Sequence, residues 1–497
     1  MWIRFFKYAI CILMNVYYFE RKKYLKIYLM TIKMYLGDKI ENTSILKYAI
    51  DYIPNNFDIF TCSDYIEYLV CKLLTFPLVE VDENGLYKKS YGLNTIEPLQ
   101  DVIGFSIKIN SNMYWNDGSN VSAQDYVNGL IRLNQSRCPI NNMLLPIKNW
   151  DEVARKEMKI QELGIEIVND NEFRLILDFP MDYIEMLLST IYISPYKCSR
   201  KDGQQLYCGP YFLKNFDKNK VTLDRNPFFS TTSNISSVEF MLIKNMEDAL
   251  EMYKNGKLAV TCNTSFPYSK LNVYREYDDF YERKESGLLF LLHVSNNQLK
   301  DYILQLLNRE EISALLNNCV NPRYSVCSKK KILYKNIFKE QEFGKKKINL
   351  IYSGYYPNEI IAKKVKEQIE RDGKIIVNLM CVSLETLSER IDSMEYDLAL
   401  GITYQCFTGA IPAFFNYMGI IKDTYIDLAI DVIENCYNGS ELNEDLLENI
   451  INNGLPCIPL LEMGSFQLIN KKLSGYVVDK QGFVALANAR FKGNSVL

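Results

Sequence analysis

The feature that most restricts the fold is an alternation of apolar runs and an amphipathic segment in the later part of the chain. Residues 357–371 place apolar side chains four apart on one helical face, between apolar runs at 348–352 and 375–380. Gly373 follows the helical segment as a C-cap, and a third apolar run covers 396–403. Strands and helices in this order predict a parallel sheet with right-handed crossovers, and therefore an α/β protein.

A turn followed by the start of a helix is visible in SNMYWNDGSNVSAQDYVNGLIRL, residues 111–133. Asn-Asp-Gly at 116–118 is a turn signal, and Ser122 with Asp125 three residues later forms a capping box. Trp115, beside the turn, is a candidate pocket residue, although a tryptophan in such a place is more often a packing anchor. The pattern itself is structural and requires no chemistry.

Another segment bounded by residues that break regular structure is CGPYFLKNFDKNKVTLDRNPFF, residues 208–229. Gly-Pro at 209–210 breaks the chain, and the apolar run that follows changes into alternating apolar and polar residues. This pattern predicts a β-hairpin with its tip at 217–220, which Asn-Pro at 226–227 ends.

The bulk composition limits the class of protein. With 497 residues, the chain is too long for one ordinary core and predicts two domains. Apolar residues at 48% and charged residues at 24% match a folded protein. A net charge of −3 argues against a nucleic-acid partner.

Histidine and cysteine usage restricts the chemistry. His293 is the single histidine and sits in the apolar run LLFLLHVSNN, which predicts a strand residue and argues against histidine-rich metal sites. The 13 cysteines form no C-x-x-C pair, so buried and reduced thiols are expected, which points weakly to a reducing compartment. No metal constellation, nucleophile motif or phosphate loop is visible, so neither an enzyme nor a cofactor is expected.

The amino end, residues 1–43, leaves three alternatives open. Arg4 and Lys7 precede an apolar run at 8–19, which is as long as a signal-peptide core but shorter than a comfortable membrane span. Charged residues at 20–23 follow in place of a small-x-small cleavage site. This extension is a degenerate signal or anchor, a helix packed on the body, or the product of a mis-called start codon.

Six segments between about 46 and 492 stand in the order expected of one family. They are LKYAIDYIPNNFDIF, MYWNDGSNVSAQDYV, CGPYFL with LDRNPFF, EDALEMYKNGKLAV, LQLLNREEISALL and NGLPCIPLL. With these segments the chain resembles the family 5 extracellular solute-binding proteins, the oligopeptide-, dipeptide- and nickel-binding components of ABC importers. Each segment alone is a weak signal, and their order carries the resemblance.

The resemblance implies a fold and an organisation. It implies a bilobal periplasmic-binding-protein-like clamp, type II and cluster C-like, with mixed sheets and an extra inserted subdomain. Lobe I would hold residues 44–262 plus 455–497, and lobe II residues 263–454. A ligand would bind in the cleft between the lobes, closure would bury it, and the closed monomer would dock on an ABC permease in the membrane.

The resemblance also implies where the ligand lies. The candidate binding residues are Tyr404, Gln405, Cys406, Phe407, Thr408, His293, Ser295, Asn296 and Trp115. Peptide-binding members carry an aspartate near 404–408 that pairs with the ligand's amino group, a charge-assisted bond. Here no acid occurs between Asp397 and Asp423. Either the ligand lacks a free α-amine or a positive charge at that place, or the alignment slips or the pocket has decayed.

Two functions from different classes remain open. The leading one is the solute-binding component of an importer for a peptide or peptide-like ligand, placed outside the cytoplasmic membrane and acting without catalysis. The alternative is a cytoplasmic sensing or accessory protein with the same clamp, which the many cysteines and the unconvincing amino end favour. Nickel binding through histidine is not supported, because His293 is the sole candidate.

Overall fold

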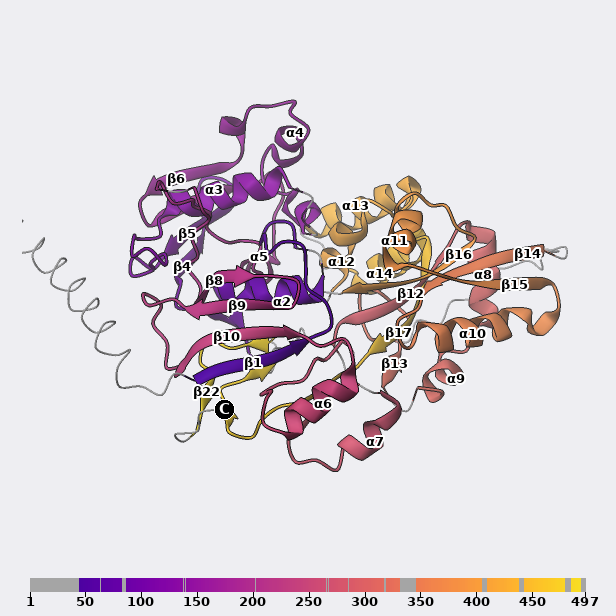
Figure 1. Cartoon of the computed structure of the whole chain (residues 1–497). Coiled ribbons are helices and arrows are strands. Elements are labelled where there is room, and N and C mark those ends of the chain that lie inside the picture. The colour runs from indigo at the N-terminus through magenta and orange to yellow at the C-terminus, as the bar shows by residue number, and fades with distance from the viewer. Residues whose placement is uncertain are drawn as a thin grey trace, which may run out of the picture.

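The structure is a computed structural model that describes residues 44–492, with gaps at 63, 83–85, 137, 139, 202, 265, 267, 285, 317–318, 331–345, 405–408, 438–441 and 479–483. The extension 1–43 lies outside the described residues, so the three alternatives for it stay open. Figure 1 shows two masses side by side, one mainly indigo to magenta and one mainly orange. The first part is built around strands between residues 44 and 242, and the second part around strands between 288 and 463.

The main sheet of the first part has the order β1-β10-β9-β8. Its strands are β1 (Ser44–Ile50), β8 (Tyr211–Phe216), β9 (Lys220–Arg225) and β10 (Ile235–Leu242). β1 runs parallel to β10, while β10, β9 and β8 are antiparallel neighbours. The hairpin predicted from the sequence is confirmed, and Asp217 closes its tip by accepting hydrogen bonds from the backbone of Asn219 and Lys220.

A smaller four-stranded sheet is inserted between β1 and β8. Its order is β4-β5-β7-β6, from strands β4 (Leu93–Pro98), β5 (Gly104–Ile109), β6 (Ile165–Asn169) and β7 (Glu172–Ile176). Helix α3 (Ala123–Asn134) packs on this sheet and begins with the predicted capping box, in which the Asp125 carboxylate accepts a hydrogen bond from the Ser122 amide at 2.9 Å. The box satisfies amide groups that a helix start leaves unpaired.

The second part contains a six-stranded sheet in the order β13-β17-β12-β16-β14-β15. The strands are β12 (Leu288–Val294), β13 (Val320–Pro322), β14 (Lys346–Ser353), β15 (Ile375–Val382), β16 (Leu398–Tyr404) and β17 (Cys457–Met463). β14 is parallel to both β15 and β16, as the alternating pattern predicts. β12 is antiparallel to β16 and to β17, so the sheet is mixed.

Helices cover both faces of the six-stranded sheet. Helices α8 (Asn297–Leu306), α9 (Arg309–Ala314) and α10 (Asn358–Ile369) pack on one face, where Phe290 and Leu292 share their apolar cluster. On the other face, Leu289 and Leu291 pack in the cluster that contains α14 (Glu444–Gly454), while α11 (Leu384–Asp392) covers Ala399. Successive residues of β12 therefore serve opposite faces, as the pleat of a strand requires.

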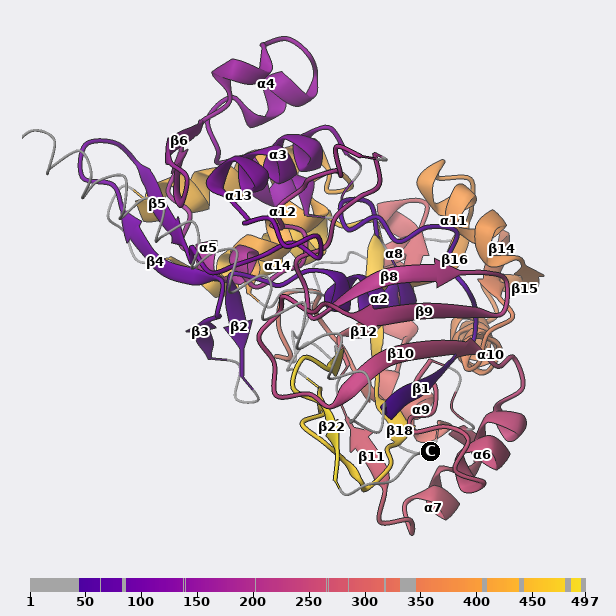
Figure 2. The same ribbon diagram turned by 60° about the vertical axis from the view of Figure 1, so that its left-hand side comes forward.

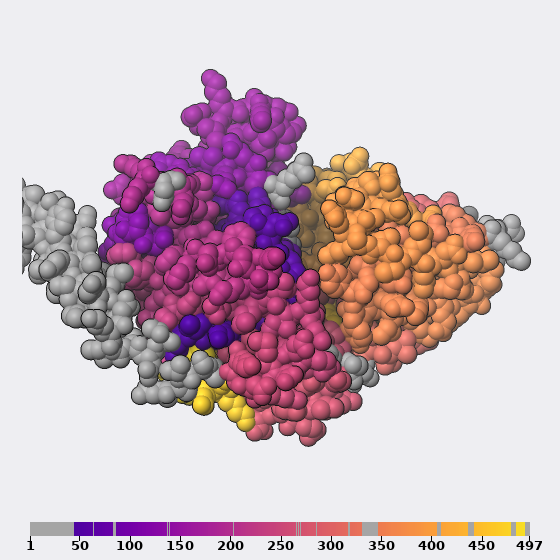
Figure 3. All heavy atoms as spheres, viewed as in Figure 1, coloured from indigo at the N-terminus to yellow at the C-terminus, as the bar shows by residue number. Residues whose placement is uncertain are grey.

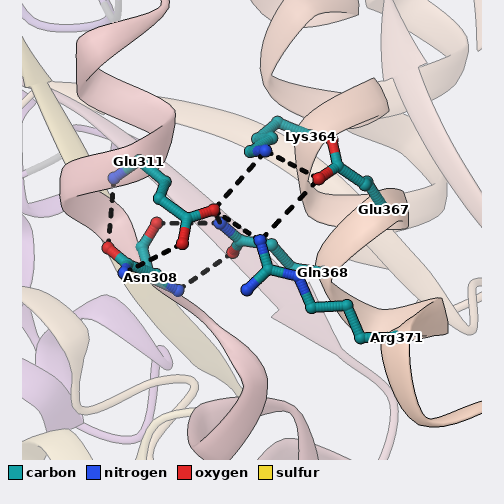
Figure 4. A network of polar contacts seen from close by, with 6 residues as sticks. All are labelled: Asn308, Glu311, Lys364, Glu367, Gln368 and Arg371. Atoms are coloured by element: carbon teal, nitrogen blue, oxygen red, sulfur yellow. Dashed lines mark hydrogen bonds and ion pairs between the residues drawn. The ribbon is translucent and has the colours of Figure 1, made fainter.

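Helices α9 and α10 are tied together by the polar network in Figure 4. The Gln368 side chain donates to the Asn308 carbonyl at 3.0 Å and accepts from the Asn308 amide at 2.9 Å. Glu311 forms ion pairs with Arg371 and Lys364 at the surface of this contact. The network fixes two of the helices that cover the second sheet.

Two stretches of chain cross between the parts and lie side by side. The Thr261 amide donates to the Leu468 carbonyl at 3.1 Å, and β11 (Phe280–Arg283) pairs with β18 (Ser465–Leu468). We call residues 260–264 and 465–469 the crossing pair. β17 is hydrogen-bonded to β12 in the second sheet. The lobe limits, including the return to lobe I at residue 455, stay a prediction.

Among the described residues, no helix combines the length and the apolar character that crossing a bilayer would require.

Candidate functional site

The two parts meet along a furrow that is visible in the space-filling view of Figure 3. Indigo residues from the beginning of the first part lie along one wall, and orange residues of the second part form the other. A crevice between two domains is a common place for a ligand, because closure can surround the ligand from two sides. The candidate site is therefore built from the residues that end strands or begin helices next to this boundary.

The second part contributes the connection from β16 to α12 (Ala410–Tyr417). β16 ends at Tyr404 and α12 begins at Ala410. The candidate residues Gln405, Cys406, Phe407 and Thr408 lie between them, outside the described residues. Gly409 follows with φ of 116°, a conformation that favours glycine, and its amide donates to the Cys327 carbonyl at 3.1 Å.

The loop around Cys327 is held by side chains of α14. Asn452 donates from its side chain to the Ser325 hydroxyl at 2.9 Å and accepts from the Val326 amide at 3.2 Å. The Ser328 hydroxyl donates to Glu448 at 2.6 Å. These bonds fix the loop whose Cys327 carbonyl positions Gly409, so α14 supports Gly409 at the start of α12.

The first part also contains a pocket of about 470 Å³. It is lined by Asp51, Tyr52, Ile53, Pro54, Asn55, Phe216, Asp217, Lys218, Leu242 and Lys244, which come from the end of β1, the β8–β9 tip and the end of β10. Carboxylates, ammonium groups and aromatic rings are all present, so the pocket can hold a ligand that has both polar and apolar groups.

A carboxyl group next to this pocket is perturbed. Tyr52 donates a hydrogen bond to Asp64, which also caps α2 (Tyr65–Leu74) by accepting from the amides of Ile66 and Glu67. Burial raises the pKa of the Asp64 carboxyl to about 7. The Asp64 carboxyl is therefore partly protonated near neutral pH.

The structure separates the site residues that the resemblance groups together. Tyr404 lies opposite Leu288 in the β12–β16 pair, whereas His293 lies opposite Ala399 at the other end of β12. Five residues of extended strand correspond to roughly 17 Å. Ser295 and Asn296 follow His293, and Asn296 caps α8 by accepting from the Leu299 amide. These three residues therefore lie at the end of β12 that is remote from Tyr404.

His293 makes packing contacts on its strand, which confirms its predicted place in a strand. Its ring lies 6.2 Å from the ring of Tyr396. A side chain at Gly401 would come within 2.7 Å of the His293 Nε2 atom, so the glycine makes room for the imidazole. Burial lowers the pKa of His293 to about 4, and the ring is therefore neutral at physiological pH.

Trp115 is a packing residue of the first part. Its side chain is 1% exposed, and its indole N–H donates to the Asp125 carboxylate at 3.2 Å. The tryptophan therefore anchors the Asp125 carboxylate of the α3 capping box. It belongs to the core, as the more common of its two interpretations predicts.

The supporting residues Ser325, Cys327 and Asn452 are missing from the sequence-based candidates. They are far apart in the sequence and meet only because α14 packs behind the loop. No local pattern marks them, since serine, cysteine and asparagine in loops and on helices are common.

The chain is similar in sequence to a family of known proteins. Residues 97–317 match the model of the bacterial extracellular solute-binding proteins, family 5 Middle. A dipeptide-binding protein of Lactococcus lactis is 22% identical over 57% of this chain, and the periplasmic oligopeptide-binding protein OppA of Salmonella typhimurium is 26% identical over 32% of it. The resemblance to the family 5 solute-binding proteins is confirmed.

Solved structures of such binding proteins share the fold over most of the chain. Haemophilus influenzae OppA in complex with RPPGFSPFR has a TM-score of 0.75 at 17% identity, covering 91% of this chain and 99% of that chain. The Escherichia coli murein tripeptide binding protein MppA has a TM-score of 0.74 at 16% identity, covering 90% and 99%. The predicted α/β clamp is therefore confirmed.

The sequence matches to curated relatives are partial. The chain spans 55% of the Lactococcus protein and 32% of the Salmonella protein. The family consists of binding proteins that act outside the cytoplasm, and its members are not enzymes.

Proposed function

We propose that this chain is the solute-binding component of an ABC importer and binds a peptide or peptide-like ligand between its two parts without changing it chemically. The furrow between the two parts carries the proposal, because residues of both parts flank it. Peptide ligands in the printed titles of fold neighbours and the name of the dipeptide-binding relative support the ligand class. We further propose that the protein acts outside the cytoplasm as a monomer and delivers its ligand to a membrane permease.

The chemistry of the proposed ligand follows from the charge of the β16–α12 connection. This connection and the residues around it, from 398 to 422, contain no aspartate or glutamate. A buried ammonium without a carboxylate partner costs several kcal/mol, so a free α-amine is disfavoured there. We propose a ligand that is neutral at this end, such as a blocked or internally bonded peptide.

Paired peptides test both statements. Binding of RPPGFSPFR and of its N-acetylated form is measured by calorimetry and by native mass spectrometry, together with a panel of free and acetylated tripeptides to hexapeptides. We expect at least one peptide to bind, and acetylation to leave its affinity unchanged or to strengthen it. Binding of no peptide in the panel would contradict the peptide class, while a large loss on acetylation would contradict the neutral end.

A second candidate is a cytoplasmic accessory protein with the same clamp. The observation that favours it is the cysteine content, 13 in the whole chain, with eight buried among the described residues. Many buried cysteines without a disulfide framework in the sequence are typical of a reducing compartment. Cell fractionation with thiol labelling separates the candidates, because a protein in the envelope fraction supports import and a cytosolic protein with free thiols supports the accessory role.

A further inference from the structure

Helix α12 makes an apolar contact between the two parts. Its sequence, AIPAFFNY, contains no charged residue, and it packs against η1 (Asn141–Leu144) of the first part. Ile411 and Phe414 of α12 are 3% and 1% exposed, while Met143 and Leu144 of η1 are 0% and 1% exposed. All four belong to a single apolar cluster that continues across the boundary.

An aromatic pair lies at the edge of this contact. The ring centroids of Phe415 on α12 and Tyr183 of the first part are 5.8 Å apart, with an angle of 45° between the planes. Tyr183 is held in place because its hydroxyl donates to the Met143 carbonyl at 2.9 Å. Phe415 is only half-buried, so its ring can be removed with less damage to the core than that of Phe414.

The contact is remote from the place where the chain crosses between the parts. Figure 2 shows α12 and α13 (Asp423–Tyr437) in the upper half of the molecule, and β11 and β18 near the bottom. A hinge motion about the crossing pair moves remote elements of the two parts most, so the α12–η1 contact must separate when the clamp opens. Hinge closure of this type is common among periplasmic binding proteins.

We propose that the packing of α12 on η1, with the Phe415–Tyr183 ring pair at its edge, is a latch that holds the clamp closed and thereby raises ligand affinity without touching the ligand. Only the predicted effect of the latch on ligand affinity rests on the proposed function. A contact made in the closed form alone increases the closed population, and apparent affinity scales with the population of the binding-competent form.

Small-angle X-ray scattering in the absence of peptide tests the latch directly. Phe415→Ala removes one ring of the pair, and we expect a larger radius of gyration than in the wild type. Tyr183→Phe keeps the ring and removes only the hydroxyl, so it should enlarge the radius of gyration less than Phe415→Ala does. Phe105→Ala, at a half-buried phenylalanine on β5, is the matched control and should leave the curve unchanged. The melting temperature of each variant confirms that it folds.

An unchanged radius of gyration in Phe415→Ala would overturn the latch, and so would an equal increase in Phe105→Ala. Affinity for RPPGFSPFR, or for the tightest peptide of the panel, should fall about three- to tenfold in Phe415→Ala, the range expected for one aromatic pair. Equal affinity of wild type and Phe415→Ala would also overturn it. If no peptide binds the wild type, the proposed function fails, while the scattering result still decides the latch.

Discussion

Lys300 shows how a single buried charge supports the candidate site from a distance. The side chain is 3% exposed and its ammonium donates to the carbonyls of Asn452 at 2.7 Å and Leu455 at 2.5 Å. These carbonyls end α14, where the helix dipole favours a positive charge. Since α14 also carries the side chains that hold the Cys327 loop, Lys300 positions that loop without lying in it.

The titration of Lys300 predicts a pH-dependent stability. Burial lowers the pKa of its ammonium to about 8, whereas the group titrates near 10.4, or about two units higher, in an unfolded chain. Between these values the unfolded chain binds more protons, so the free energy of unfolding rises with pH. In Lys300→Met this contribution is absent. Across that pH window, the free energy of unfolding of the wild type relative to that of the variant should therefore increase by roughly 1 kcal/mol per pH unit.

Urea unfolding at a series of pH values measures this difference. Lys257→Met, at an exposed lysine, is the control and should follow the wild type at every pH. Parallel curves for wild type and Lys300→Met would show that Lys300 keeps its proton in the folded state throughout the window.

At the scale of elements, the sequence pattern located helices and strands well. The amphipathic segment 357–371 is α10 at Asn358–Ile369, and the run 396–403 is β16 at Leu398–Tyr404. Gly373 has φ of 70° just after the short helical turn that follows α10, as a C-cap requires. The antiparallel pairing of β12 with β17 could not be predicted from the pattern, because it joins residues more than 150 positions apart in sequence.

The contact between α9 and α10 predicts two unequal mutational effects. Gln368 is 0% exposed, so Gln368→Ala leaves the Asn308 amide and carbonyl without their side-chain partner and should cost about 1–3 kcal/mol of unfolding free energy. Glu311→Ala removes ion pairs of a side chain that is 39% exposed, and should cost less than Gln368→Ala because solvent screens such pairs. Chemical denaturation of both variants checks the order, and a larger loss in Glu311→Ala would contradict it.

At the scale of the whole molecule, the crossing pair carries a buried polar network. The Gln467 side chain donates to the Tyr48 hydroxyl at 2.5 Å and to the Thr261 carbonyl at 3.0 Å, and it accepts from the Tyr476 hydroxyl at 3.0 Å. Gln467 and Thr261 lie on the two different crossing segments. The network therefore joins both crossing segments to the first part and stabilises the hinge.

Gln467→Leu should destabilise the crossing pair. The change removes the three hydrogen bonds that the buried Gln467 side chain makes, at a cost of about 1–3 kcal/mol for each buried group left unsatisfied, so the melting temperature should fall by several degrees. Because the crossings connect the two parts, we also expect a broader calorimetric transition as the parts begin to unfold separately. Gln298→Leu, at an exposed position, is the control, and an unchanged transition in Gln467→Leu would contradict a structural role for the network.

The amino-acid sequence was sufficient for the local elements and the α/β class, because caps, turns and apolar periodicity act over a few residues and leave a direct mark. The capping box at Ser122 and the hairpin tip at Asp217 are such marks. Which residues meet at the site depended on tertiary packing. His293 and Tyr404 share a strand pair but lie at its opposite ends, and Cys327 reaches Gly409 only through the support of α14. Register and packing join residues that are remote in sequence, and no local pattern encodes those distances.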